Sequence, residues 1–189
     1  MKTIKPTDLQ PGDIPAICTP KGFLPKGIRA FMWLWSVIHY RRIPKGKLYN
    51  HTMIVFFPGK IAEAVKRGYV RHLFMEHYAD RLEHMVVFRP RQPLTAAEIE
   101  KLQQASLAMA DRNVEYEILN FFYWMVYIVT NGRVDWFPKG SKIDDKVFCF
   151  EVSATHTNDY RPGFFARPSH TNTVDLQNDD RFEQLYFKE

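Results

Sequence analysis

The chain has 189 residues, the length of one ordinary domain or of two small ones. Apolar types make up 46% of it and charged types 25%, which is a globular composition and excludes disordered, collagen-like and coiled-coil classes. The formal net charge is +5, with nine Lys or Arg against two Asp or Glu in positions 1–50. We expect a single domain spanning residues 1–189, with a basic N-terminal part that is compatible with anionic partners.

The first half of the chain predicts a turn, a helix and then several strands. Pro11–Gly12 predicts a turn that leads into a short strand. The large apolar residues of positions 27–40 predict a buried helix. Segments rich in β-branched and aromatic residues follow, and they predict strands at 49–57, 60–65, 69–74 and 84–89. Pro58–Gly59 lies between the first two of these strands and predicts a hairpin, although positions 60–67 taken alone are also compatible with a helix.

The second half predicts three helices and a final strand. Thr95 and Glu98 form a capping box at the start of a helix that runs to about Ala110. Positions 115–130 are nearly all apolar and predict a buried helix. Positions 148–157 predict a short helix, and the alternation in 182–188 predicts a returning strand. Because the strands cluster in one half with helices around them, we expect an α+β fold with an antiparallel sheet packed against helices.

The sequence shows no sign of export or of a membrane span. The N-terminal residues MKTIKPTDLQPGD lack the apolar core and cleavage site of a signal peptide. The longest apolar stretch, 118–129, is shorter than the ~20 residues that cross a bilayer. We therefore expect a cytoplasmic protein.

Cys149 is the first candidate for chemistry. A thiol acts as a nucleophile in its thiolate form, and the start of a helix favours that form. The segment before Cys149 is rich in lysine and glycine and predicts a loop or a short strand, so the helix should begin near the cysteine. Cys18 lies in a proline-rich segment with no helix start behind it, and we expect it to be a small buried hydrophobe. One disulfide between the two is compatible with the sequence, but free thiols are our expectation.

His51 and Glu63 are the other two candidates. His51 stands at the head of an apolar strand, where a histidine can serve as general base. If the hairpin loop consists of the three residues 57–59, Glu63 opposes Met53 and is the diagonal neighbour of His51 on the same face. A two-residue loop would instead place the two side chains on opposite faces. In the first register, Glu63 would orient the imidazole and stabilise its protonated form.

The remaining polar residues carry weaker signals. His72, His77 and His84 lie at mixed spacings that match no metal site. His156 shares the helix of Cys149 but lies about two turns away. Asp13 belongs to the turn near the N-terminus, and its expected role is structural.

The order of these motifs resembles the circularly permuted papain-like hydrolases of the NlpC superfamily. The relevant segments are PGDI near the start, YNHTMIVF, IAEAVKRGYV, a helical middle and FCFEVS near the end. The resemblance is to the branch of YiiX/YaeF-like amidases, with lecithin:retinol acyltransferase-like proteins as relatives. In this group the histidine strand precedes the cysteine helix, and a polar residue follows the histidine by twelve positions, as Glu63 follows His51. The usual Cys-Ser-Glu-Leu-Val motif is matched in part by Cys149–Ser153, where Phe150 replaces the small residue.

The resemblance implies a permuted papain-like fold and a thiol hydrolase with a Cys149–His51–Glu63 triad. Such an amidase or peptidase would cleave an amide or ester bond in a small peptide, a cell-wall peptide or an acyl-linked substrate, through a thioester intermediate. The chemistry requires no cofactor and no metal. Two alternatives stay open: an acyltransferase that uses the same thioester, and a non-catalytic basic module that binds anionic lipid or nucleic acid. We favour the enzyme, with no nucleic acid and no obligate protein partner, and with peripheral membrane contact as an option.

Overall fold

The computed structural model describes residues 2–19, 23–44, 46–116, 118–130, 132–135 and 146–188, and it shows a mixed α+β protein with mainly antiparallel sheets. The strands are β1 (Lys2–Ile4), β2 (Ile14–Ile17), β3 (His51–Thr52), β4 (Ile54–Phe57), β5 (Lys60–Val65), β6 (Gly68–Leu73), β7 (Met85–Pro90), β8 (Glu115–Tyr116), β9 (Lys146–Val147) and β10 (Phe182–Phe187). The α-helices are α1 (Phe23–His39), α2 (Phe74–Tyr78), α3 (Ala96–Asp111), α4 (Ile118–Val129), α5 (Cys149–Tyr160) and α6 (Thr173–Asn178).

Two sheets form the framework. The larger has the strand order β1-β10-β7-β2-β3 and is antiparallel except for the β1–β10 pair. The smaller is the antiparallel meander β4-β5-β6. The chain passes from one sheet to the other at Met53, whose N–H donates to the carbonyl of Pro15 over 3.0 Å, while the Val55 N–H donates to that of Asp13 over 2.9 Å. Strand β2 therefore holds both sheets together beside His51.

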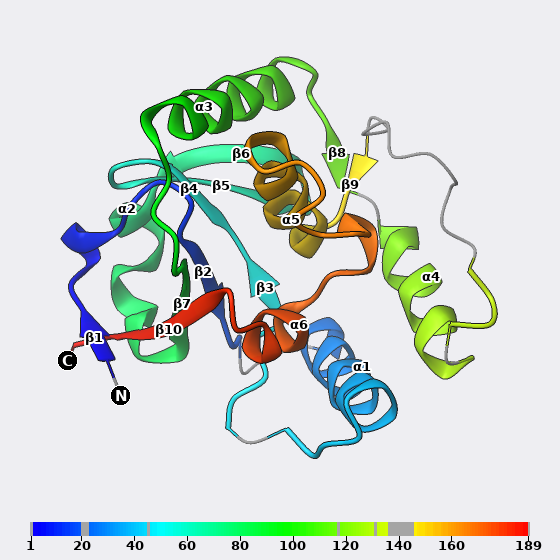
Figure 1. Ribbon diagram of the computed structural model, residues 1–189. Helices are drawn as coiled ribbons and strands as arrows, with labels where there is room; N and C mark the ends of the chain where they lie inside the picture. Colours follow the sequence, from blue (N-terminus) through cyan, green and yellow to red (C-terminus); the bar gives the residue numbers. More distant parts are fainter. Residues whose placement is uncertain are drawn as a thin grey trace.

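Helix α5 lies across the middle of the molecule (Figure 1). In this view α3 lies above it, and α1 and α6 lie below. Its side chains enter two hydrophobic clusters: Val152 and Ala154 pack with β2, β4 and β5, whereas Cys149 and Phe150 pack with α1 and α4. The start of α5 is thus fixed between the sheets and the α1–α4 pair.

The helix predicted over 115–130 is shorter than expected. Its first two residues form strand β8, which pairs in parallel with β9, and α4 runs over Ile118–Val129. The prediction that this helix is buried was wrong, because Phe122 is 50% and Val129 62% exposed. Helix α1, predicted over 27–40, begins earlier and also has an exposed face. Both helices lie at the edge of the molecule, so each buries one side only. Within the described residues, no helix combines the length and the apolarity that a membrane crossing needs.

Candidate active site

Cys149 is the first residue of α5, as the sequence predicted. The preceding Phe148 has an extended backbone (φ −108°, ψ 154°), and its N–H donates to the Glu151 carboxylate over 3.3 Å. Glu151 therefore caps the helix and does not orient the thiol. The side chain of Cys149 is buried but lines a cavity of about 670 Å³. The thiol thus lies at the positive end of the helix dipole, beside space for a ligand.

His51 and Glu63 line the same cavity as Cys149. The Nε2 atom of His51 contacts Oε2 of Glu63, and Cys149 lies close enough to the ring to raise the pKa of His51. Because Nε2 is engaged by the carboxylate, the other ring nitrogen, Nδ1, is the one left for the thiol. The structure therefore brings together the three side chains that the sequence singled out at positions 51, 63 and 149. Both cysteines are free.

The β4–β5 hairpin has the register that places Glu63 on the histidine side, but its loop differs from the three-residue loop predicted from the sequence. Phe57 pairs with Lys60, so the loop consists of two residues, Pro58 and Gly59 (φ +71°). Proline followed by a left-handed glycine is the signature of a type II turn, which splays the strands of a hairpin. A β-bulge between Val55 and Phe57 inserts one extra residue, and the ladder then continues with Ile54 opposite Ala62. The bulge restores the register in which Glu63 faces the histidine side.

Thr52 connects the histidine strand to the cysteine helix. Its hydroxyl donates to the carbonyl oxygen of Cys149 over 3.0 Å and accepts from the hydroxyl of Ser153 over 3.1 Å. Both side chains are buried. Because Thr52 directly follows His51, these two hydrogen bonds set the position of the thiol relative to the imidazole.

Two further residues surround the carboxylate of Glu63. The Tyr78 hydroxyl donates to Oε2 over 2.8 Å and lies 3.0 Å from Oε1. The Nε2 atom of His72 lies 2.7 Å from Oε1, at an angle outside that of an aligned hydrogen bond. Sequence reasoning missed both residues. The turn Lys66–Arg67, which pairs Val65 with Gly68, could have placed His72 on the face of Glu63; Tyr78 lies on a five-residue helix that had no clear signal.

The electrostatics favour an ion pair between His51 and its neighbours. Burial acts to lower the pKa of His51, but the charge of a Cys149 thiolate, the hydrogen bond to it and the Glu63 carboxylate together raise that pKa to about 10. Burial acts to raise the pKa of Glu63, but contacts from His51, His72 and Tyr78 hold it below the ordinary 4.5. The arrangement therefore favours the protonated form of His51 beside an ionised Glu63.

The cavity wall is mainly apolar, with cations near the carboxylate. Ile17, Pro25 and Ile28 line it on one side and Ala64 and Val65 on the other. Lys66 and Arg81 are exposed and also line it. Tyr116 completes the wall beside the thiol: burial, and then the charge of Cys149, raise the pKa of this tyrosine. Its hydroxyl therefore stays protonated and can donate a hydrogen bond to an anion.

The other sequence candidates have structural surroundings. Asp13 accepts from Arg89 Nε over 2.8 Å and from Nη2 over 2.7 Å, which confirms its structural role. His156 is buried, contacts Tyr69 Oη over 2.9 Å and lies away from the cavity. No group of three His, Cys, Asp or Glu among the described residues is arranged to hold a metal ion.

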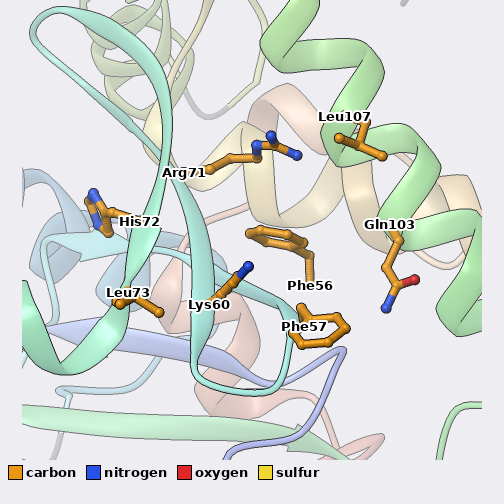
Figure 2. A pocket seen from close by; sticks show the side chains of 8 residues that line it. All are labelled: Phe56, Phe57, Lys60, Arg71, His72, Leu73, Gln103 and Leu107. Carbon is orange, nitrogen blue, oxygen red and sulfur yellow. The ribbon is translucent and has the colours of Figure 1, made fainter.

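A second cavity, of about 450 Å³, lies between the β4–β5 hairpin, β6 and α3. Figure 2 shows Arg71 on the same side of β6 as Phe56 and Leu107, whereas His72 points to the other side. The Arg71 guanidinium lies 5.4 Å from the centre of the Phe56 ring, and Lys60 Nζ lies 5.4 Å from that of Phe57. The sheet separates this groove from Glu63, and its cations are already in contact with aromatic rings.

No protein-family model matches the chain, and comparisons with curated proteins and with solved structures find no similar protein.

Proposed function

We propose that this protein is a cysteine hydrolase that cleaves an amide or ester bond through a thioester intermediate. The observation that carries the proposal is the convergence of a sulfur at a helix start, an imidazole and a buried carboxylate on one cavity. The carboxylate has its own support from Tyr78 and His72, which a simple surface ion pair would not need. Nucleophile, base and orienting acid are the three parts of this chemistry.

In the proposed reaction, the Cys149 thiolate attacks the substrate carbonyl while His51 carries the proton. The Cys149 N–H, at the start of α5, and the Tyr116 hydroxyl would stabilise the oxyanion of the tetrahedral intermediate. Collapse of this intermediate breaks the bond to the leaving group, which takes the proton from His51 and departs. The thioester remains on Cys149. Water then loses a proton to His51 and attacks the thioester, and the acid product leaves with the thiol restored.

We propose that residues 1–189 form one domain of the permuted papain-like kind. In that group a histidine strand precedes the cysteine helix and a polar residue lies on the next strand, which is the order of His51, Glu63 and Cys149 here. The apolar wall of the cavity suits an acyl or other apolar group next to the scissile bond. Peptide-linked and acyl-linked substrates are therefore both compatible with the site.

A thioester-based acyltransferase is the second candidate, and the same apolar wall favours it. Both activities share every step up to the thioester and differ in the group that resolves it. Release of product from a labelled acyl donor, measured with and without an added amine acceptor, separates them. The hydrolase proposal expects most of the label in the free acid, whereas a transferase gives mainly the acceptor conjugate.

The test of the proposed nucleophile is the rate of alkylation by iodoacetamide, with Cys18 as the internal control. An ordinary thiol has a pKa of about 8.5 and reacts slowly below pH 7. We expect Cys149 to react at least about tenfold faster than Cys18 at pH 6, and we expect His51→Ala to abolish the excess. As a control, Cys149 and Cys18 should be alkylated at equal rates in the unfolded chain, which shows that the difference comes from the folded structure. If folded Cys149 reacts no faster than Cys18, or if His51→Ala reacts as fast as the parent protein, the proposal is wrong.

A further inference from the structure

Two helices at one edge of the molecule expose large apolar side chains. Helices α1 and α4 contact each other and share a hydrophobic cluster (Figure 1). Trp33 on α1 is 46% exposed, and Ile43, which follows α1, is 72% exposed. Phe122 and Val129 on α4 are at least half exposed. We call this surface, defined by Trp33, Ile43, Phe122 and Val129, the α1–α4 flank. Large apolar side chains exposed on two neighbouring helices indicate an interaction surface.

The spacing of residues along each helix separates an inner face from an outer face. On α1 the buried residues Ile28, Met32 and Trp35 form the inner face. Lys26, Ala30 and Trp33 lie four and three positions apart on the opposite face and are exposed. On α4, Trp124 and Ile128 are buried, whereas Phe122 and Val129 lie two turns apart on the outer side. Each helix therefore presents large apolar side chains to solvent as well as to the core, and the outer face of α1 also carries Lys26.

The chain around α1 carries cations and no acidic residue, and Asp135, which follows α4, is paired with Arg167 over 2.9 Å. The chain contains no Asp or Glu between Asp13 and Glu63 but eight Lys or Arg, and the sequence of α4 contains no charged residue. Lys26, Arg41 and Arg42 are exposed. The nearby Asp175 is buried, where it accepts hydrogen bonds from Trp35 and Tyr40, so it does not offset these cations at the surface. The flank thus combines exposed aromatic and aliphatic groups with nearby cations. Such a surface is complementary to a partner that has anionic groups at its surface and apolar groups beneath them.

We propose that the α1–α4 flank docks on an anionic lipid bilayer. Trp33, Phe122 and Val129 would enter the interface between headgroups and acyl chains, where tryptophan is favoured, and the three cations would face anionic headgroups. A nucleic acid would pair with the cations but would leave Ile43 and Val129 exposed to water. A bilayer buries both kinds of group, and for this reason it is the occupant that the flank fits best.

The catalytic cavity lies on the other side of α1 from the flank. Ile28, which lines that cavity, belongs to the buried inner face of the helix, opposite Trp33. Docking of the flank does not rest on the proposed function, because no residue of the triad belongs to it. The variant Cys149→Ala should therefore bind vesicles as well as the parent protein does.

Sedimentation of the full chain with lipid vesicles tests the proposal. We expect binding to vesicles of phosphatidylcholine with roughly a third phosphatidylglycerol, at least about tenfold weaker binding to phosphatidylcholine alone, and a loss of binding as salt is raised. Arg41→Gln/Arg42→Gln should weaken binding about 25-fold, since each cation near the surface contributes roughly fivefold. Trp33→Ala should weaken it by about tenfold and remove the shift of tryptophan fluorescence on binding.

Matched controls come from the groove in Figure 2, which also has exposed apolar residues and cations. Leu107→Ala and Lys60→Gln/Arg71→Gln should leave vesicle binding within about twofold of the parent protein. Unfolding curves of all variants show whether each is folded. The proposal is refuted if the parent protein ignores anionic vesicles, if it binds duplex DNA or RNA in their place, or if the groove variants lose as much binding as the flank variants.

Discussion

Replacing Thr52 with valine tests how the histidine strand and the cysteine helix are held together. Valine keeps nearly the same volume at this buried position, so no cavity forms. The substitution removes the donor to the Cys149 carbonyl and the acceptor for the Ser153 hydroxyl, which are 3.0 Å and 3.1 Å away. The Ser153 hydroxyl is then buried without the acceptor that it has in the parent protein.

The expected cost follows from these two hydrogen bonds. A buried polar group that loses its partner costs about 1–3 kcal/mol, and a hydrogen bond that is lost without this penalty costs about 1 kcal/mol. We therefore expect Thr52→Val to lower the free energy of unfolding by about 2–4 kcal/mol, which lowers Tm by roughly 4–16 °C in a chain of this size. In Thr52→Val/Ser153→Ala both partners are apolar. The double variant should thus be at least about 1 kcal/mol more stable than the sum of the single effects predicts.

Urea unfolding measures these free energies, and iodoacetamide at pH 6 measures the effect on the thiol. Because Thr52 adjoins His51, its loss should slow alkylation of Cys149 by about tenfold through misplacement of the sulfur. Thr157→Val is the matched control: its hydroxyl donates over 2.8 Å to the Ser153 carbonyl in the same helix, away from β3. It should cost about 1 kcal/mol and leave alkylation unchanged. Additive single effects, or equal alkylation in Thr52→Val and the parent protein, would refute the reasoning.

Three further variants test the surroundings of the triad. Glu63→Gln should slow thioester formation by about 10²–10⁴-fold, because His51 loses the carboxylate that supports its charge. Because the pKa of Glu63 is lowered in the folded state, the parent protein should lose stability as pH falls below 4.5. The free energy of unfolding of Glu63→Gln in urea should change less over the same pH range. Tyr78→Phe should lower the free energy of unfolding by about 1.5–3 kcal/mol, whereas Tyr160→Phe, whose buried hydroxyl has no hydrogen-bond partner among the described residues, should cost little in the same urea titration. Tyr116→Phe should lower kcat by about 10²-fold and leave alkylation of Cys149 within about twofold, and a kcat equal to that of the parent protein would exclude this hydroxyl as an oxyanion donor.

Local sequence signals were sufficient where one residue type determines the structure. The Thr95–Glu98 capping box predicted the start of α3, and both of its hydrogen bonds are present. Pro11–Gly12 predicted the turn before β2, and Gly12 has the positive φ (+90°) that such a turn requires. The start of α5 at Cys149 was also predicted; strand β9 (Lys146–Val147) precedes it, and the rest of the predicted loop or strand, 138–145, lies outside the described residues. Each of these signals lies within a few residues of the turn or helix start that it determines, so tertiary contacts did not change the predicted structure.

The hairpin register could not be derived from the same kind of signal. Pro58–Gly59 fixed the turn, but the bulge at Phe56 has no marker in the sequence, since it depends on how both sheets share β2. The sequence prediction contained two errors, a three-residue loop and a ladder without a bulge. Their effects on the register cancel, so Glu63 was still placed on the correct face. A residue count from the loop alone would have predicted the wrong face.

The exposed helices and the supports of Glu63 depend on tertiary packing. Apolar density in 27–40 and 115–130 indicated helices but could not show that each has one face toward solvent. His72 and Tyr78 reach the carboxylate from β6 and α2, and their roles depend on the placement of both elements around β5. The placement of His51 and Cys149 at the starts of a strand and a helix was predictable, whereas the placement of His72 and Tyr78 around Glu63 was not.

The most direct test of the proposed function is to trap the thioester. The protein is mixed with a p-nitrophenyl ester of a short acid, quenched in acid within the first turnover, digested and analysed by mass spectrometry. We predict the acyl group on the peptide that contains Cys149, absent in His51→Ala, and not on the peptide that contains Cys18. An unmodified Cys149 during turnover, or equal labelling of both cysteines, would contradict the account.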